Sequence, residues 1–249
     1  SLTSIIIPDN VTTIGEYAFS SCSELTSVTL SENLESVGKY AFEKCSSLTN
    51  ITIPNSVTTI GEDAFSGCSS LTSIIIPDSV TTIGGSAFFV CSSLTSVTLS
   101  ENLESIGAYA FYNCSSLTSI TIPDSVTTIG NSAFNGCYSL KTIYCETESK
   151  PVDWNNGWIY NCSATILWGC IKHGEYNGFT YAIQKIQNET SVIITGYIGS
   201  NTDITIPSEI EGYQVKTIYE RAFYNCSSLT SVTLSENLES IGRDAFYNC

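Results

Sequence analysis

The chain has 249 residues, 42% of them hydrophobic, which is enough to bury the core of one elongated domain or of two smaller ones. Twenty-four Asp and Glu residues against nine Lys and Arg residues give a net charge of −15, which repels phosphate backbones and anionic lipid surfaces. We therefore expect no nucleic-acid partner. No run of about 18 apolar residues offers a membrane span, so we also expect no direct membrane insertion by this chain.

Cysteine and phenylalanine residues recur with a period of 23 residues, and a repeat of this length dictates the fold more firmly than local propensity does. An alanine directly precedes every periodic phenylalanine. The chain stops in the middle of a repeat, so we expect it to be a piece of a longer protein. The periodic positions are Cys22, Cys45, Cys68, Cys91, Cys114, Cys137, Cys226 and Cys249, and Phe19, Phe42, Phe65, Phe88, Phe111, Phe134, Phe223 and Phe246.

The residue pattern within each repeat predicts a strand, a turn, a shorter strand and a short helix. In the repeat that starts at Leu71, apolar residues alternate up to Ile76, which is typical of a strand with one buried face. The proline that follows cannot continue a paired strand. A second run of β-branched residues ends at Ile83. From there Ile83, Ala87 and Cys91 recur every four residues, which favours one face of a short helix.

One such unit cannot bury its own apolar face, so neighbouring units must stack into a continuous core with parallel strands in register. A single parallel sheet should result. Its strands should begin near Leu2, Leu25, Leu48, Leu71, Leu94 and Leu117.

The recurring pattern Leu-x-x-Ile-x-Ile resembles that of leucine-rich repeats. The run from Leu117 to Gly130, followed by Ala133-Phe134 and Cys137, resembles the BspA-type class more specifically. The resemblance spans residue 1 to about residue 145, and 204–249. It implies a β-rich α/β solenoid, a right-handed superhelix with a parallel β-sheet and short helices on its convex side. It further implies a surface or secreted protein of host-associated anaerobic bacteria or parasitic protists, often an adhesin.

The repeats differ from one another mostly on the predicted helix side. Residues 2–70 match residues 71–139 at 53 of 69 positions, so this chain contains recent internal copies. Aromatic residues gather among the differences, and interfaces favour exposed aromatic residues. Neutral drift on an unused surface is the alternative interpretation. The candidate binding surface comprises Tyr17, Tyr40, Phe89, Val90, Tyr109 and Tyr112.

The periodicity divides the chain into three predicted parts. Residues 1–170 form a leucine-rich-repeat array, closed by a cap that is rich in tryptophan. Residues 171–203 form a linker and a hairpin, with two strands around the turn Asn188-Glu189-Thr190. Residues 204–249 begin a second, truncated array, with a longer turn over 208–216.

The eleven cysteines favour buried free thiols, because equivalent residues of stacked units repeat every ~4.8 Å and free Cys behaves as a small apolar residue. Some disulfide pairing and a metal site are the alternatives for the periodic cysteines. The lack of a Cys-x-x-Cys motif argues against metal. Cys145, Cys162 and Cys170 lie outside the periodic set, and a bridge among them stays open.

No catalytic or metal-binding constellation is visible in the sequence. His173 is the only histidine, which excludes a triad or a multi-histidine site within this chain and favours an exposed linker residue. Paired carboxylates such as Glu101 and Glu104 recur in one turn of several repeats, and we interpret them as a solvated rim. No phosphate-binding glycine loop or nucleophile elbow appears. We expect no enzyme and no cofactor.

Two functions fit these observations. The first is a binding or adhesion module, secreted or at the cell surface, that is monomeric and takes a host or matrix protein or a glycan as its partner. The second is a passive spacer that carries another domain away from the cell. Both fit the extended faces of a solenoid.

Overall fold

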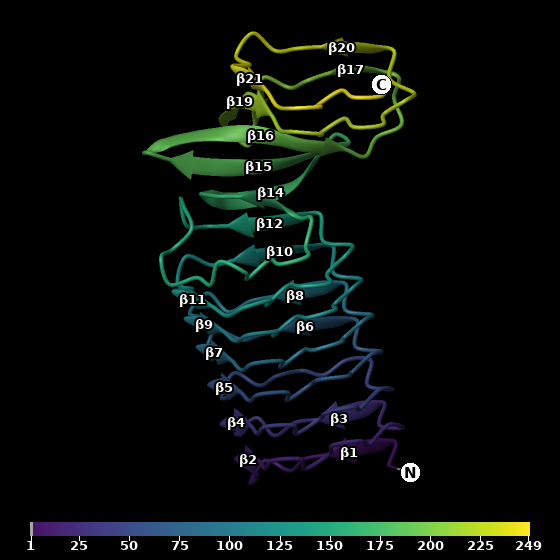
Figure 1. Ribbon diagram of the computed structural model, residues 1–249, viewed down its shortest axis with the longest axis vertical. Helices are drawn as coiled ribbons and strands as arrows, with labels where there is room; N and C mark the ends of the chain where they lie inside the picture. The colour runs from purple at the N-terminus through teal and green to yellow at the C-terminus, as the bar shows by residue number, and fades with distance from the viewer. Residues whose placement is uncertain (1) are drawn as a thin grey trace. The chain divides into compact units, whose positions relative to one another are not determined.

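The computed structural model describes residues 2–249, so Ser1, the first residue of the predicted array, lies outside the described residues. The described residues form two compact units, one up to residue 167 and the other over residues 168–249. The first unit is a solenoid, which climbs one coil at a time from the N-terminus (Figure 1). We number its regular coils by residues: coil 1 is 2–24, coil 2 is 25–47, coil 3 is 48–70, coil 4 is 71–93, coil 5 is 94–116 and coil 6 is 117–139.

The first strands pair in parallel wherever they pair, as expected, but the predicted single sheet is wrong, because they form three separate groups and the strand expected near Leu48 is missing. The pairs are β1 with β3, β6 with β8, and β10 with β12 and then β13. In coil 3 the equivalent residues 50–53 form no strand. The strands are β1 (Ser4–Ile6), β3 (Ser27–Thr29), β6 (Ser73–Ile75), β8 (Ser96–Thr98), β10 (Ser119–Ile122), β12 (Thr142–Cys145) and β13 (Thr165–Leu167).

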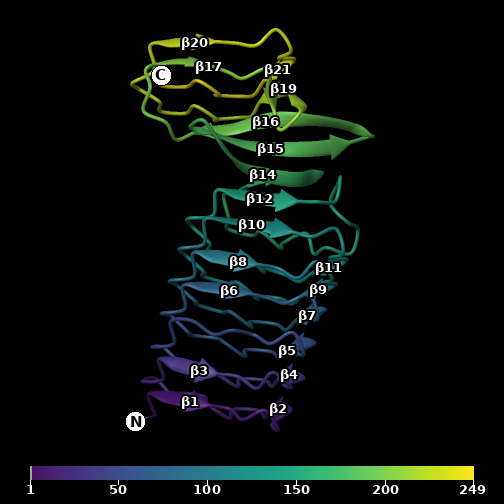
Figure 2. The ribbon, with the colours of Figure 1, turned by 180° about the vertical axis from the view of Figure 1, so that it is seen from behind.

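The second, shorter strands form the continuous sheet of the first unit. All six pair in parallel, each displaced by one repeat from the next. They lie on the opposite side of each coil from the first strands, as the two views show (Figures 1 and 2). They are β2 (Thr13–Ile14), β4 (Ser36–Val37), β5 (Thr59–Ile60), β7 (Thr82–Ile83), β9 (Ser105–Ile106) and β11 (Thr128–Ile129).

The predicted short helices are wrong: residues 2–249 contain no helix, and a series of turns takes their place. In coil 2 the φ angles of Tyr40 and Lys44 are 55° and 58°, in the left-handed region, and an α-helix cannot continue through such residues. The same two positions have positive φ in the other regular coils, for example at Tyr109 and Asn113. A spacing of four apolar residues fits this series of turns as well as it fits a helix.

Backbone hydrogen bonds between coils explain why turns replace the helix. The N–H groups of Tyr40, Phe42 and Lys44 donate to carbonyls of coil 3 at 2.9, 2.8 and 2.6 Å. The N–H groups of the residues between them donate within the coil and so form turns. Ala41 N–H, for example, donates to Gly38 O at 3.3 Å. A helix would use all of these donors internally. We call this third set of contacts between coils the turn ladder.

The core runs up the middle of the solenoid as columns of equivalent residues. The phenylalanines from Phe42 to Phe134 are fully buried, and successive rings stack at centroid distances of 5.3–5.5 Å. Residues 140–164 continue the stack as an irregular coil, in which Trp158 meets Phe134 edge to face at 5.9 Å. Trp154 is also buried, and its Nε1–H donates to Val126 O at 3.1 Å.

The second unit combines an antiparallel hairpin with further repeats. Strands β15 and β16 contain the two expected strand segments, and their turn falls at Gln187-Asn188, where both φ angles are positive. The long turn expected over 208–216 is itself a hairpin of β18 and β19. The strands are β14 (Cys170–Tyr176), β15 (Phe179–Ile186), β16 (Glu189–Tyr197), β17 (Asp203–Thr205), β18 (Glu209–Ile210), β19 (Tyr213–Ile218), β20 (Ser231–Thr233) and β21 (Ser240–Ile241).

Candidate functional site

A groove of about 620 Å³ lies on the face of the first strands, over coils 3 to 5. We call it the strand-face groove. Consecutive residues of coil 4 run along it, flanked by residues of coils 3 and 5, because a parallel stack of coils places equivalent residues side by side. Its lining residues are Asn50, Ile51, Thr52, Ile53, Asn55, Ser73, Ile74, Ile75, Ile76, Pro77, Asp78, Thr98, Leu99 and Glu101.

Ile75 is the most unusual residue of the groove, because it is a large apolar side chain that is 68% exposed. The equivalent residues of the adjacent coils are Thr52 and Thr98, which are also exposed. The branched side chain at this position points away from the core, since Ile74 and Ile76 on either side of it are buried. An exposed apolar residue within a recess that also contains buried apolar atoms offers a ligand area to cover.

Two carboxylates, those of Asp78 and Glu101, line the groove where the first strands end. They occupy the same position of successive coils, and the N–H of Glu101 donates to Asp78 Oδ1 at 3.1 Å. Both residues are exposed, and for Glu101 this agrees with the predicted solvated rim. No Lys, Arg or His lines the groove, so this end of it is negative.

The predicted aromatic surface appears as two separate clusters. Tyr17 and Tyr40 stack at 4.6 Å, whereas Phe89 stacks on Tyr112 at 4.9 Å and Tyr109 meets Tyr112 edge to face at 5.8 Å. In coil 3, between the clusters, an aspartate occupies the position of the tyrosines.

Much of the aromatic area is already used between coils. Tyr17 and Tyr109 are 52% and 40% exposed, while Tyr40, Phe89, Val90 and Tyr112 are half-buried. Stacking of equivalent rings from successive coils is the same arrangement that the buried phenylalanines show. These side chains therefore support the stack of coils in addition to presenting an outer surface.

The periodic cysteines form the predicted buried column in the middle of the array. No disulfide joins any of the cysteines within residues 2–249, Cys145, Cys162 and Cys170 included, and the cysteines from Cys45 to Cys137 are buried. Burial raises the pKa of the Cys45 and Cys137 thiols to about 12, which keeps them protonated and unreactive at neutral pH. Among residues 2–249, no group of three or more His, Cys, Asp or Glu side chains could hold a metal ion.

The thiols also make a contact that spacing alone does not reveal. The thiols from Cys45 to Cys137, and that of Cys249, each donate to the carbonyl of the phenylalanine 26 residues earlier, as Cys114 Sγ does to Phe88 O at 3.2 Å. The same carbonyl accepts the N–H of Cys91 at 3.3 Å. A carbonyl oxygen has two lone pairs, so the thiol fills the second one. Cysteine therefore supplies a small apolar volume together with a donor.

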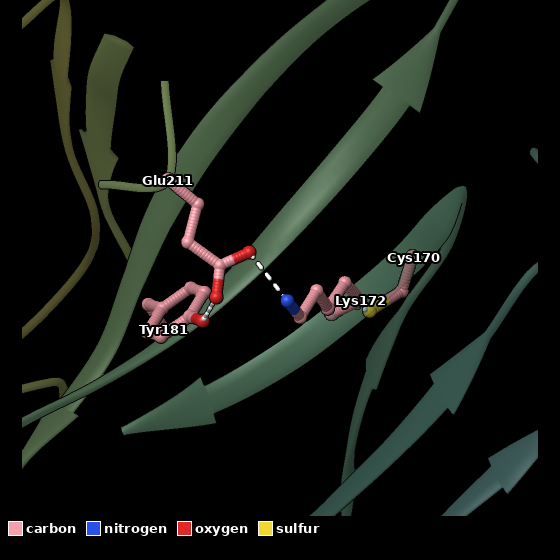
Figure 3. A network of polar contacts seen from close by, with 4 residues as sticks. All are labelled: Cys170, Lys172, Tyr181 and Glu211. Carbon is pink, nitrogen blue, oxygen red and sulfur yellow. Dashed lines mark hydrogen bonds and ion pairs between the residues drawn. The ribbon is translucent and has the colours of Figure 1, made fainter. Parts of the chain in front are cut away.

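A polar network in the second unit joins two hairpins (Figure 3). The Glu211 carboxylate accepts hydrogen bonds from Tyr181 Oη and from Lys172 Nζ, both at 2.6 Å. The pKa of Glu211 is lowered, first by the hydrogen bond from Lys172 and then by that from Tyr181. Lys172 and Tyr181 donate hydrogen bonds that Glu211 accepts, so the network holds β14 and β15 to the turn between β18 and β19. His173 is exposed, as predicted, but lies within β14 and not in a linker.

The stacked coils define a leucine-rich-repeat solenoid, and comparison with known proteins identifies its class. The BspA type leucine rich repeat region matches residues 1–92, 67–167 and 196–249, in six copies. The chain therefore belongs to the BspA-type leucine-rich-repeat family, as its sequence pattern predicted. A search of curated proteins gave no match. No helix within residues 2–249 is long and apolar enough to cross a membrane.

Two solved structures resemble this chain over almost all of its length. One is a leucine rich cell surface protein from Faecalibacterium prausnitzii, 33% identical, with a TM-score of 0.55, covering 100% of this chain and 59% of that one. The other is a leucine-rich repeat protein from Bacteroides ovatus, 25% identical, with a TM-score of 0.51, covering 99% of this chain and 64% of that one. The present chain thus spans less than two thirds of either relative.

Proposed function

We propose that this chain is a non-catalytic binding or adhesion module at the bacterial cell surface, and that it binds a protein partner through the face of its first strands. The observation that carries this proposal is the strand-face groove, in which exposed Ile75 lies in a recess with an acidic end. Pockets that combine apolar walls with a few polar groups are the usual form of a binding site. The name of the Faecalibacterium relative supports the location.

The aromatic residues on the turn side provide an alternative binding surface. Two variants separate the two surfaces. In the first, lysine replaces the strand-face threonines Thr29, Thr52, Thr98 and Thr121. In the second, serine replaces Tyr17, Tyr40, Phe89, Tyr109 and Tyr112.

The experiment measures binding of the parent chain and both variants to a panel of extracellular matrix proteins and to a glycan array. Circular dichroism and the thermal unfolding midpoint first establish that each variant folds. We expect the parent chain to bind at least one matrix protein, the lysine variant to lose that binding, and the serine variant to retain it. Loss of binding by the serine variant alone would indicate that the binding site is the aromatic surface. Absence of binding by the folded parent would favour a passive spacer.

A further inference from the structure

The shape of the strand-face groove selects an elongated ligand. Its lining includes the six consecutive residues 73–78 of one coil. At about 3.3 Å per residue, an extended stretch of this length covers roughly 20 Å. Residues of coils 3 and 5 flank it on both sides. A chain that lies along the strands fits this space better than a compact ligand does.

The composition of the groove selects alternating side chains. Ile51, Ile53, Ile74, Ile76 and Leu99 also line the groove, but these residues are at most 6% exposed, so Ile75 supplies its large exposed apolar surface. Hydroxyl and amide groups of Asn50, Thr52, Ser73 and Thr98 line the same space. An extended peptide presents apolar side chains and backbone polar groups in alternation, so it can use both kinds of contact.

The negative charge of the groove favours one orientation of the ligand, with a cationic residue at one of its ends. Asp78 and Glu101 lie together where the first strands end, and the lining includes no cationic residue. The chain as a whole carries a net charge of −15, which repels acidic ligands over a longer range. A Lys or Arg side chain at one end of the ligand complements this part of the groove.

From these three features we infer that the groove binds an extended segment of a partner protein that carries alternating apolar side chains and a Lys or Arg residue at one end. This inference rests on the proposed function and specifies its partner. The cationic end lies against Asp78 and Glu101, and an apolar side chain covers Ile75.

The chain itself provides matched controls for both contacts. Ile6 occupies in coil 1 the position that Ile75 occupies in coil 4, and it is 76% exposed but outside the groove lining. Asp9 and Glu32 occupy the position of Asp78 and Glu101 in coils 1 and 2. Ile6→Thr and the double variant Asp9→Asn/Glu32→Gln therefore make the same chemical changes elsewhere on the same face.

The experiment selects binders for the parent chain from a random peptide display library. Enriched peptides are then synthesised and titrated against the parent and the variants by fluorescence anisotropy. We expect enrichment of apolar residues at alternate positions and of Lys or Arg at one end. Ile75→Thr should weaken binding by about 10-fold, because it replaces two apolar carbons with a hydroxyl group. Asp78→Asn/Glu101→Gln should weaken it at low salt and have less effect at about 0.5 M NaCl, where charges are screened. The two control variants should bind as the parent does.

Several results would overturn the inference. These are no enrichment, enrichment of acidic or uncharged peptides, or equal loss of binding in the control variants. A matrix protein that binds the parent and the groove variants equally would leave the binding function in place and remove the groove as its site. If the parent chain bound only glycans and Ile75→Thr abolished that binding, the ligand of the groove would be a carbohydrate and not a peptide.

Discussion

The phenylalanine of each coil shows how one residue type, repeated, builds a core. Phe111 is fully buried and stacks on Phe88 at 5.3 Å and on Phe134 at 5.4 Å. Phe111→Ala should therefore lower the free energy of unfolding by about 3 to 5 kcal/mol, because it opens a cavity in the middle of a packed column. Tyr17→Ala, at an exposed ring, is the control and should cost less. Urea titration measures both, and an unchanged midpoint for Phe111→Ala would show that the ring is not part of the core.

Val90 illustrates the opposite case, a residue poorly suited to its backbone. Its φ of 56° lies in the left-handed region, which β-branched residues strongly disfavour. Coils 3, 5 and 6 have Gly67, Asn113 and Gly136 at the same position. Val90→Asn should thus raise the free energy of unfolding by about 0.5 to 1 kcal/mol, even though it removes a half-buried apolar side chain. Asn113→Val should lower it by a similar amount. If both substitutions are destabilising, packing outweighs backbone strain at this position.

In coils 2 to 6, one glycine packs closely against the backbone of the preceding coil. A Cβ atom on Gly107 would lie 2.4 Å from Gly85 N and 2.6 Å from Gly84 C, which are backbone atoms that cannot move aside. Gly107→Ala should consequently force the coils apart and cost about 1 to 3 kcal/mol or more. Gly15 is the matched control, since it has the same position in coil 1 and a Cβ atom there would meet nothing within 4 Å. Gly15→Ala should be neutral or slightly stabilising, and thermal unfolding of the two variants side by side distinguishes the effects.

Glu211 joins the two hairpins of the second unit through hydrogen bonds from Lys172 and Tyr181. Its pKa is lowered below the ordinary 4.5 by hydrogen bonds from Lys172 and Tyr181. A depressed carboxyl pKa contributes stability that is present above the unfolded value and is lost as pH falls through the folded value. The second unit should accordingly lose stability below about pH 4.5, and Glu211→Gln should reduce that part of the acid sensitivity. Glu209→Gln, an equal charge change on β18, should keep the sensitivity. Hydrogen exchange of the β15 and β19 amides, followed from neutral pH down to about pH 3, measures it.

At the scale of the whole molecule, the period of 23 residues is itself a structural requirement. Each coil contacts mainly its neighbours, so stability is roughly a sum over coils and their interfaces. Removal of residues 94–116, one complete coil, should leave a folded array with a lower unfolding midpoint. Removal of residues 94–115, one residue fewer, shifts the phenylalanine and cysteine columns out of register and should prevent cooperative folding. Equal cooperativity of the two deletions would contradict the assigned register.

The sequence predicts features that equivalent side chains determine together. The period, the parallel pairing and the buried columns of Phe42 and Cys45 with their equivalents follow from the repeat itself. The repeat pattern could not distinguish short helices from turns, because both fit the spacing of Ile83, Ala87 and Cys91. What distinguishes them is the partner of each N–H group, and that partner lies in the next coil.

The candidate site shows the same limit. The sequence contains an isoleucine at Ile75 in a row of threonines, and carboxylates at the turn position of Asp78 and Glu101, but the sequence pattern did not single out Ile75 or Asp78 as part of a site. Their shared recess depends on how closely three coils approach one another, which a single strand pattern does not encode. The aromatic residues were visible as variable positions, but their stacking into two clusters depends on the same spacing.

The peptide groups of the turn ladder share one electrical direction. The peptide group between Ala41 and Phe42 accepts a hydrogen bond from coil 1 through its C=O and donates one to coil 3 through its N–H. The groups that precede Tyr40 and Lys44 do the same, so three peptide dipoles of about 3.5 D each point the same way in this coil. Equivalent groups in the other regular coils continue the alignment. Within the turn ladder the N–H ends therefore point toward the C-terminal coil, the reverse of an α-helix, in which they point toward the N-terminus. Donors elsewhere in the coil point the other way, as Gly38 N–H does to Ile14 O at 3.0 Å, and offset this alignment.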